Sequence, residues 1–327
     1  MSDKKNKNVD VKELNAEQLL KEADKKAEDS SMWRTFIRRF KRSKTAIIGF
    51  ILLIIMFSTA IFGPIIYAGF EFSIGDMEIS WGGTHGHHYR SQNLDNNLAP
   101  QSWEHPLGTD HLGRDVLARV LWGGRVSLAV GFVAMGIAGT IGIILGASAG
   151  YFGGAVDMII MRFTEIIMSF PLLFLLLTIL ALFDGGGIML IMVVIGLTGW
   201  TGICRLVRAE FLSLRERDFT QAAQALGASD IRIIFKHILP NAMAPLIVSI
   251  TLGVGGAILT ETTLSFLGIG ITPPDPSWGN VLNDGQSYLR DHHHLTTYPG
   301  LFIFLTILGY NFLGDGLRDS LDPRLKQ

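Results

Sequence analysis

The sequence predicts an all-α membrane protein, a polytopic bundle of six transmembrane helices, and three observations support this prediction. The chain has 327 residues, of which 48% are hydrophobic and only 17% are charged. Its mean hydropathy of +0.35 is typical of a membrane protein rather than of a soluble domain. Six apolar segments also have about the 20 residues that a membrane-spanning helix needs.

The six apolar segments carry few charges. They cover residues 45–68, 126–148, 158–183, 185–204, 242–270 and 295–314. In the third segment, Arg162 and Glu165 lie three residues apart, so they share one helix face and can pair. Glu261 in the fifth segment either lines a polar cavity or caps a neighbouring helix. Pro171 and Pro245 are expected to kink or start helices, so the bundle should contain bends.

Basic residues predict the orientation, because short segments rich in Lys and Arg remain in the cytoplasm. The stretch WRTFIRRFKRSK before the first segment holds six basic residues and no acidic ones. We therefore expect a multi-pass protein of the cell (plasma or inner) membrane with a cytoplasmic N-terminus, and six spans return the C-terminus to the cytoplasm. The expected regions are a cytoplasmic tail with an interfacial amphipathic helix (1–44), the first span (45–68), an extracytoplasmic segment (69–125), a transmembrane core (126–314) that includes a cytoplasmic loop (205–241) and an outer loop (271–294), and a cytoplasmic tail (315–327).

The charged region before the first span has two parts with different patterns. Residues 1–30 mix Lys, Asp and Glu, which predicts a solvated tail. Further on, Trp33, Phe36, Ile37 and Phe40 recur at helical spacing between basic residues. This second pattern predicts a helix that lies in the inner membrane interface.

Small residues recur at every fourth position of the second apolar segment and just beyond it. They are Ala134, Ala138, Gly142, Gly146 and Gly150. Small side chains at this spacing let two helix backbones approach closely in lipid. We expect this seam to pack either against a partner subunit or against another helix of the same chain.

The loop FTQAAQALGASDIRIIFKHILPNAMAP, residues 219–245, predicts two short helices joined by a tight turn. Gly227 suits the position after the first helix, where the backbone takes a positive φ. Ser229 can cap the second helix, with Asp230 in its first turn. Pro240 is expected to end that helix, because the residue before a proline avoids the α conformation. The loop either docks into a groove of another protein or packs on the bundle as a plain helical hairpin.

This loop resembles the coupling loop of ABC-importer permeases, in which E-A-A is followed by three residues, Gly, nine residues and an apolar-x-L-P ending. Here the pattern is QAAQALG…HILP, with Gln221 in place of Glu and His237 at the apolar position. The resemblance implies that the loop couples to ATPase subunits. The residues implied in this coupling are Gln221, Ala222, Ala223, Gly227, Ala228, Ser229, Leu239 and Pro240.

Four further stretches resemble the C-type subunit of the dipeptide, oligopeptide and nickel permease family. They are HPLGTDHLGRDVLARVLWGGRVSLAVG, YFGGAVDMIIMRFTEIIMSFP, ETTLSFLGIGITPPDPSWG and NFLGDGLRDSLDPRL. The family often has Asp at the position of Glu165, and residues 70–101 form a longer segment than the family is expected to have. The residues of these motifs are expected to be structural, namely Gly108, Thr109, Asp110, Gly113, Arg114, Asp115, Glu261 and Asp315.

The resemblance implies the type I fold of ABC-importer permeases and a role as one half of a translocation pathway. The implied partners are a homologous second permease subunit, two cytoplasmic ABC ATPases, an extracytoplasmic solute-binding protein and membrane lipids, with no nucleic acid. The expected cargo is oligopeptides or dipeptides; the alternatives are an importer of nickel or another metal ion, and a secondary transporter. The chain has no G-x-x-x-x-G-K-[ST] motif. We therefore expect ATP and Mg²⁺ on the partner ATPases, no cofactor on this chain, and no enzyme activity of its own.

Eight of the nine histidines fall in the expected outer segments, where six of them form two clusters. The clusters are HGHH, with His85, His87 and His88, and DHHH, with His292, His293 and His294. Neutral imidazole binds zinc, copper and nickel well. Three interpretations stay open: a metal site formed between the two loops, a pH-dependent contact with the binding protein, and hydrophilic loop composition without a ligand.

Overall fold

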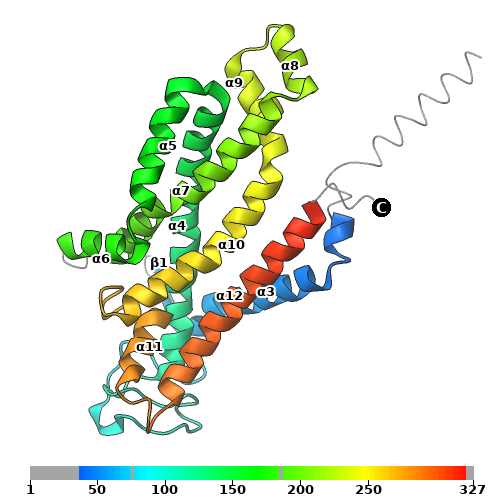
Figure 1. The fold of residues 1–327 in the computed structure, drawn as a ribbon. Helices are drawn as coiled ribbons and strands as arrows, with labels where there is room; N and C mark the ends of the chain where they lie inside the picture. The colour runs from blue at the N-terminus through cyan, green and yellow to red at the C-terminus, as the bar shows by residue number, and fades with distance from the viewer. Residues whose placement is uncertain (1–36, 75–76, 184–186, 322–327) are drawn as a thin grey trace, which may run out of the picture.

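The computed structural model describes residues 37–74, 77–183 and 187–321, which form an elongated bundle of helices (Figure 1). Within these residues, five helices are long and apolar enough to cross a membrane. They are α3 (Lys44–Ala68), α4 (Val116–Phe152), α7 (Gly187–Arg215), α10 (Leu239–Phe266) and α12 (His294–Leu321). The predicted tail (1–30), the last residues (322–327), and Trp33 and Phe36 of the predicted interfacial helix lie outside the described residues. Residues 37–40 of that interfacial helix are helical.

Shorter elements lie between the long helices. They are α5 (Gly154–Met168), α6 (Leu172–Leu182), α8 (Asp218–Ala225), α9 (Asp230–Arg232), α11 (Trp278–Gln286), the 3₁₀ helix η1 (Leu94–Asn96) and the π-helix η2 (Ile233–Ile238). Helices α8 and α9 lie at one end of the bundle, and α11 lies at the opposite end (Figure 1). We call these the α8 end and the α11 end. The predicted helical bundle is thus confirmed, although α4 and α12 extend beyond the predicted spans.

The third predicted span, residues 158–183, is bent near Pro171, as the sequence predicts. Its two halves, α5 and α6, meet at 85°, so the chain has six spans only if this pair counts as one. Pro171 lies immediately before α6 with an extended ψ of 121°. Proline cannot donate a backbone hydrogen bond and its ring clashes with the preceding turn. The predicted effect of Pro171 on the helix is therefore confirmed.

The prediction that Pro240 ends a helix is wrong, because the helical run from Asp230 continues to Phe266. Leu239, directly before the proline, has helical angles (φ −56°, ψ −45°), and its N–H donates to the carbonyl of Ile234, five residues back. The wider π-helical turn of η2 changes the hydrogen-bond register just where Pro240 has no donor to offer. The side chain of Asn241 donates to the carbonyl of His237 at 2.6 Å. The proline is thereby accommodated near the start of α10.

The small-residue seam of α4 packs against α7 of the same chain. A Cβ added to Gly142 would lie 2.8 Å from Cβ of Ile203, and one added to Gly150 would lie 2.6 Å from Cβ of Phe211. Gly146 approaches the backbone of α7 in the same way, at the carbonyl of Cys204. Of the two alternatives left open by the sequence, packing within this chain is therefore the one that the structure supports.

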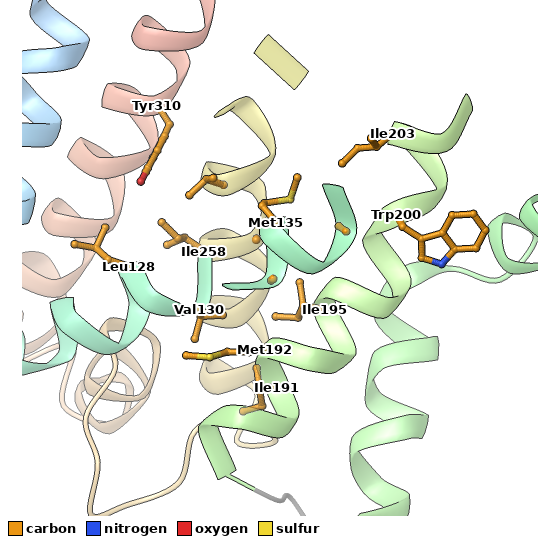
Figure 2. Close-up of a cluster of buried hydrophobic side chains, with 14 of the residues drawn as sticks. Leu128, Val130, Met135, Ile191, Met192, Ile195, Trp200, Ile203, Ile258 and Tyr310 are labelled. Carbon is orange, nitrogen blue, oxygen red and sulfur yellow. The ribbon is translucent and has the colours of Figure 1, made fainter. Parts of the chain in front are cut away.

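Apolar side chains from four helices meet in the core between them (Figure 2). Those labelled in the figure are Leu128, Val130 and Met135 from α4, Ile191, Met192, Ile195, Trp200 and Ile203 from α7, Ile258 from α10 and Tyr310 from α12. Inside a membrane, van der Waals packing of such side chains stabilises helix contacts, because lipid tails are as apolar as the core and hydrophobic transfer contributes little. The core fixes α4, α7, α10 and α12 relative to one another.

A two-stranded antiparallel hairpin follows α3 and departs from the all-α expectation. Its strands are β1 (Phe70–Ile74) and β2 (Met77–Trp81), with Phe70 opposite Trp81. The two stretches, FEFSI and MEISW, alternate apolar and polar residues, which is typical of strands. The hairpin belongs to the long segment 70–101, whose role the sequence does not predict.

Candidate functional site

The predicted coupling loop projects from the α8 end of the bundle (Figure 1). Helix α8 ends as the sequence predicts, with Gly227 at φ +76°. The N–H of Gly227 donates to the carbonyl of Gln224 at 3.0 Å, and the N–H of Ala228 donates to the carbonyl of Ala223 at 3.1 Å. These two bonds form a Schellman motif, which requires a left-handed residue at the glycine position. A side chain at residue 227 would meet open space, so backbone conformation is the reason for glycine here.

The loop presents small and apolar side chains at its surface. Gln221 and Ala222 are exposed, while Ala223 and Ala228 are half-buried. Four large apolar residues are also exposed there, namely Phe219, Leu226, Ile231 and Phe235. Leu226, beside the turn, is 88% exposed. The pattern of the loop sequence does not mark Ile231 and Phe235, because their exposure depends on the tertiary fold.

The second half of the loop begins at Ser229, which occupies the cap position as predicted. Its side chain makes no capping hydrogen bond, which corrects that part of the prediction. Asp230 lies in the first turn and accepts a hydrogen bond of 2.7 Å from the hydroxyl of Tyr151 on α4. Leu239 and Pro240 lie where the run enters α10, half-buried and exposed respectively.

The loop is anchored to the bundle at its base. Thr220 is buried and donates to the carbonyl of Leu214 at the end of α7, at 2.8 Å. Ile233 and Ile238 are fully buried on the other side of the loop. The loop is therefore short, anchored at its base, and continuous in the chain with both α7 and α10.

A buried ion-pair network occupies the α11 end. Arg114 contacts Asp110 at 2.7 Å and Asp284 at 2.9 Å, and Arg119 contacts the same two carboxylates at 2.6 and 2.7 Å. Burial alone would raise the pKa of Asp110, but Arg119 and Arg114 outweigh it and hold that pKa below its ordinary value. Asp284 lies on α11, so the network joins the start of α4 to α11.

The other residues of the GTDHLGRD motif shape the turns around this ion-pair network. Gly108 and Gly113 have positive φ angles of +75° and +67°, which allow the tight turns. The hydroxyl of Thr109 accepts from the N–H of Ala99 at 2.8 Å. Asp115 caps α4 by accepting from the N–H of Ala118 at 2.8 Å. This geometry suits the structural role that the sequence predicts for the motif.

Glu261 is fully buried between three helices rather than open to a cavity. It accepts hydrogen bonds from Ser127 on α4 at 3.2 Å and from Ser265 on α10 at 2.7 Å. Ser127 also accepts from the N–H of Trp278, the first residue of α11, at 3.2 Å. Glu261 therefore holds α4 and α10 at the start of α11, which is closer to the capping alternative. Asp315 lies elsewhere, exposed on α12.

A hollow of about 490 Å³ lies between α5 and α7. It is lined by Met161, Thr164, Glu165, Met168, Ser169, Arg205 and Arg208. The predicted pairing of Glu165 with Arg162 is confirmed at 2.9 Å, but both side chains are largely exposed. Arg208 is paired with Asp157 across the two helices, at 2.6 Å between Nη2 and Oδ2. The hollow therefore offers few unpaired charges to a ligand.

The histidine clusters are divided among different neighbours. His85 stacks on Tyr67, and His88 lies against Tyr89 and Trp122. His292 and His293 lie beside His294, whose Nε2 is buried close to Gly108. Across the described residues, the group of three that could share a metal ion is His87, Glu104 and His105. No sequence pattern marks Glu104 and His105 as neighbours of His87, because they lie far from it along the chain.

Two family models match this chain. The family described as binding-protein-dependent transport system inner membrane component matches residues 142–327. The N-terminal TM domain of oligopeptide transport permease C matches residues 31–100. A chain of the MetNI methionine ABC transporter has a TM-score of 0.49 at 19% identity, covering 63% of this chain and 96% of that one.

Three relatives represent the similarity in sequence. The dipeptide transport system permease protein of Alkalihalophilus pseudofirmus is 39% identical over 296 residues, which cover 90% of this chain and 91% of the relative. The oligopeptide transport system permease protein of Haemophilus influenzae is 39% identical over 320 residues, covering 97% and 96%. The glutathione transport system permease protein of Pectobacterium atrosepticum is 35% identical over 294 residues, covering 90% and 92%.

Proposed function

The chain belongs to the family of binding-protein-dependent transport system inner membrane components, and on that premise we propose that it is a permease subunit of an ABC importer of oligopeptides or dipeptides. The relatives named above carry dipeptide, oligopeptide and glutathione in their names, which are all short peptides. This agreement favours peptides over the nickel alternative. The network of buried charges at the α11 end and the bundle core suit a scaffold for transport rather than a catalytic centre.

The proposed complex has the partners that the sequence implies. A homologous second permease completes the pathway, two cytoplasmic ATPases carry ATP and Mg²⁺, and a solute-binding protein delivers the peptide on the outer side. The absence of a G-x-x-x-x-G-K-[ST] motif in this sequence supports the assignment of ATP hydrolysis to other chains. The chain itself is proposed to carry no cofactor and no enzyme activity.

One observation carries the proposed coupling mechanism: an exposed loop of small and apolar residues is built rigidly onto two long helices. Phe219, Leu226, Ile231 and Phe235 expose apolar surface at the α8 end, away from the bundle core. A groove on an ATPase that receives α8 and the Gly227 turn would bury this surface. Closure of the ATPases would then move α7 and α10 together.

This mechanism places the α8 end in the cytoplasm and the α11 end outside. The six basic residues of WRTFIRRFKRSK support a cytoplasmic N-terminus. With the bent pair of α5 and α6 counted as one span, the C-terminus returns to the same side. The hairpin, η1 and α11 then face the solute-binding protein.

Mass spectrometry of the proteins that copurify with this chain from native membranes in mild detergent tests the proposal. We expect a second permease, two ATPases and a peptide-binding protein, with peptides in the bound fraction. Recovery of a metal-binding receptor in place of the peptide-binding protein would favour the nickel alternative. Recovery of the intact chain alone would contradict an ATP-driven importer.

A further inference from the structure

We propose that His87, Glu104 and His105 form a binding site for a divalent transition-metal ion of the zinc type. The potential ligand atoms of these three side chains all lie within 4.8 Å of one another. They come from two turns in the segment between α3 and α4. The site is separate from the coupling loop and does not depend on what the protein transports.

His105 is already oriented as a metal ligand. Its Nδ1 lies 2.8 Å from Oδ2 of Asp115, and both side chains are buried. Asp115 is held in turn by the N–H of Ala118 and the hydroxyl of Tyr67, at 2.8 and 3.0 Å. A carboxylate that accepts from Nδ1–H fixes the tautomer in which Nε2 keeps its lone pair. Metal-binding histidines use this arrangement with a carboxylate partner.

The turn that carries His87 is fixed against the end of α3. The N–H groups of Thr84 and His85 donate to the carbonyls of Ile66 and Tyr67, at 2.9 and 3.2 Å. The side chain of His85 is also hydrogen-bonded, through Nε2, to the carbonyl of Trp103 at 3.1 Å. This bond brings the turn of His87 beside the turn that carries Glu104 and His105.

The two imidazoles lie next to each other, stacked face to face. The ring centres of His87 and His105 lie 4.6 Å apart, with 30° between the ring planes. Two imidazoles that share a tetrahedral ion, with bonds of about 2.0–2.1 Å, place their ring centres roughly 5 Å apart. The ring separation therefore suits a shared ion, which would bind once the half-buried ring of His87 turns out of the stack so that both imidazoles direct a nitrogen at it.

Glu104 supplies the third ligand, and its exposure determines what else the ion can bind. Its carboxylate is exposed, so it can rotate toward the imidazoles without disturbing the fold. Two histidines and one carboxylate leave a fourth position open to water or to a ligand from a partner. Imidazole favours zinc, nickel and copper over magnesium and calcium, which prefer oxygen ligands.

The bound ion would connect the outer segment to the helix bundle. It would link the turn at residues 84–88 to the turn at residues 102–105, and through Asp115 to the N-terminus of α4. The DHHH cluster offers a matched comparison, because His293 is an exposed histidine that has histidine neighbours. No carboxylate joins that cluster in a three-ligand group among the described residues.

The test uses the full-length protein in detergent, stripped with a chelator and titrated with Zn²⁺ in competition with a chromophoric chelator. We expect one tight site in the wild type. His87→Ala and Glu104→Gln should each weaken it at least tenfold, while His88→Ala and His293→Ala should leave it unchanged. Cobalt in place of zinc should give visible absorption typical of a tetrahedral site, and Glu104→Gln should change it. Excess Mg²⁺ and Ca²⁺ should not compete.

Two results would overturn the site. The first is wild-type zinc affinity in both His87→Ala and Glu104→Gln. The second is an equal loss in His293→Ala, which would assign binding to the DHHH cluster. Glu104→Gln is nearly isosteric at an exposed position, so a folded variant is expected. Gel filtration and circular dichroism of each variant check that any loss of binding occurs in folded protein.

Discussion

The hydroxyl group of Tyr151 on α4 donates a hydrogen bond of 2.7 Å to Oδ1 of Asp230, the first residue of α9. The carbonyl of the same Tyr151 accepts from Nη1 of Arg215, the last residue of α7, at 2.9 Å. Tyr151, at the end of α4, thus contacts both the last residue of α7 and the first residue of α9, which lies in the predicted coupling loop. In the proposed mechanism, these contacts would link α4 to the movement of α8, α7 and α10.

Replacing Tyr151 with Phe should weaken coupling more than stability. The change removes one hydrogen bond, which contributes about 0.5–1.5 kcal/mol to stability. We expect peptide uptake to fall several-fold while ATP hydrolysis by the complex continues. The measurement is the ratio of the peptide uptake rate to the ATP hydrolysis rate in proteoliposomes. Tyr298→Phe is the control, because its hydroxyl accepts from Gln101 outside the loop. An unchanged ratio in Tyr151→Phe would remove this link from the mechanism.

Gly227→Leu should abolish transport and leave membrane insertion intact. A leucine at φ +76° costs about 1–2 kcal/mol of backbone energy and places a large side chain at the docking surface. Uptake assays combined with membrane fractionation check both parts. Gly227→Asn should retain transport, because asparagine tolerates this conformation. Gly268→Leu tests strain alone, since Gly268 has φ +80° and open space beside it. Wild-type uptake by Gly227→Leu would contradict the coupling assignment.

Asp110→Asn should destabilise the protein by about 3–5 kcal/mol, because it leaves buried Arg114 and Arg119 partly uncompensated. The pKa of Asp110 is depressed in the folded protein, so its contribution is present above the unfolded-state pKa of about 3.9. That contribution is lost as the pH falls through the lower folded-state pKa. Thermal unfolding in detergent should therefore show a constant gap from wild type between about pH 7 and 5 that shrinks in more acidic buffer.

The exposed Asp95 provides the control for this network. Asp95→Asn should unfold at nearly the same temperature as the wild type across the whole pH range. A gap for Asp110→Asn that stays constant down to the most acidic buffer would argue against the ionised network as its cause.

Gly146→Leu should separate α4 from α7 and destabilise the bundle. A side chain at this position would collide with the backbone of α7 at Cys204 and with Val207. Overpacking of this kind costs about 1–3 kcal/mol or more. Gly136→Leu is the matched control on the same helix, because a Cβ there meets open space. The two variants are compared by their melting temperatures after detergent extraction. Equal melting temperatures would contradict close packing of the small-residue seam against α7.

The sequence predicts the long helices well, because hydropathy and length are local properties. Gly227 is predicted correctly for the same reason, since a left-handed helix end needs glycine at that residue. The prediction that Pro240 ends a helix is wrong, because a π-helical turn compensates for the missing N–H donor of the proline. This compensation depends on the register of the whole run from Asp230, which no rule about one residue captures.

The ion-pair network and the histidine group are less predictable, because the residues that meet there lie far apart in the sequence. The pairing of Arg114 with Asp284 joins two segments that share no pattern. The same holds for His87 and His105, which the fold brings together through the hydrogen bond of His85 to Trp103. The motif around Asp110 marks the right residues, but their partners emerge only from the structure.

Disulfide or chemical cross-linking at residue 222 tests the central claim most directly. Cys204 is the single cysteine of the chain and is buried, so Ala222→Cys introduces one accessible thiol. With the copurified ATPases present, we predict a cross-link from residue 222 to an ATPase, at a rate that changes when ATP is bound. Leu94→Cys, which is exposed on η1 outside the loop, should give none. Cross-linking at residue 94 but not at residue 222 would contradict the assignment of the loop as the coupling element.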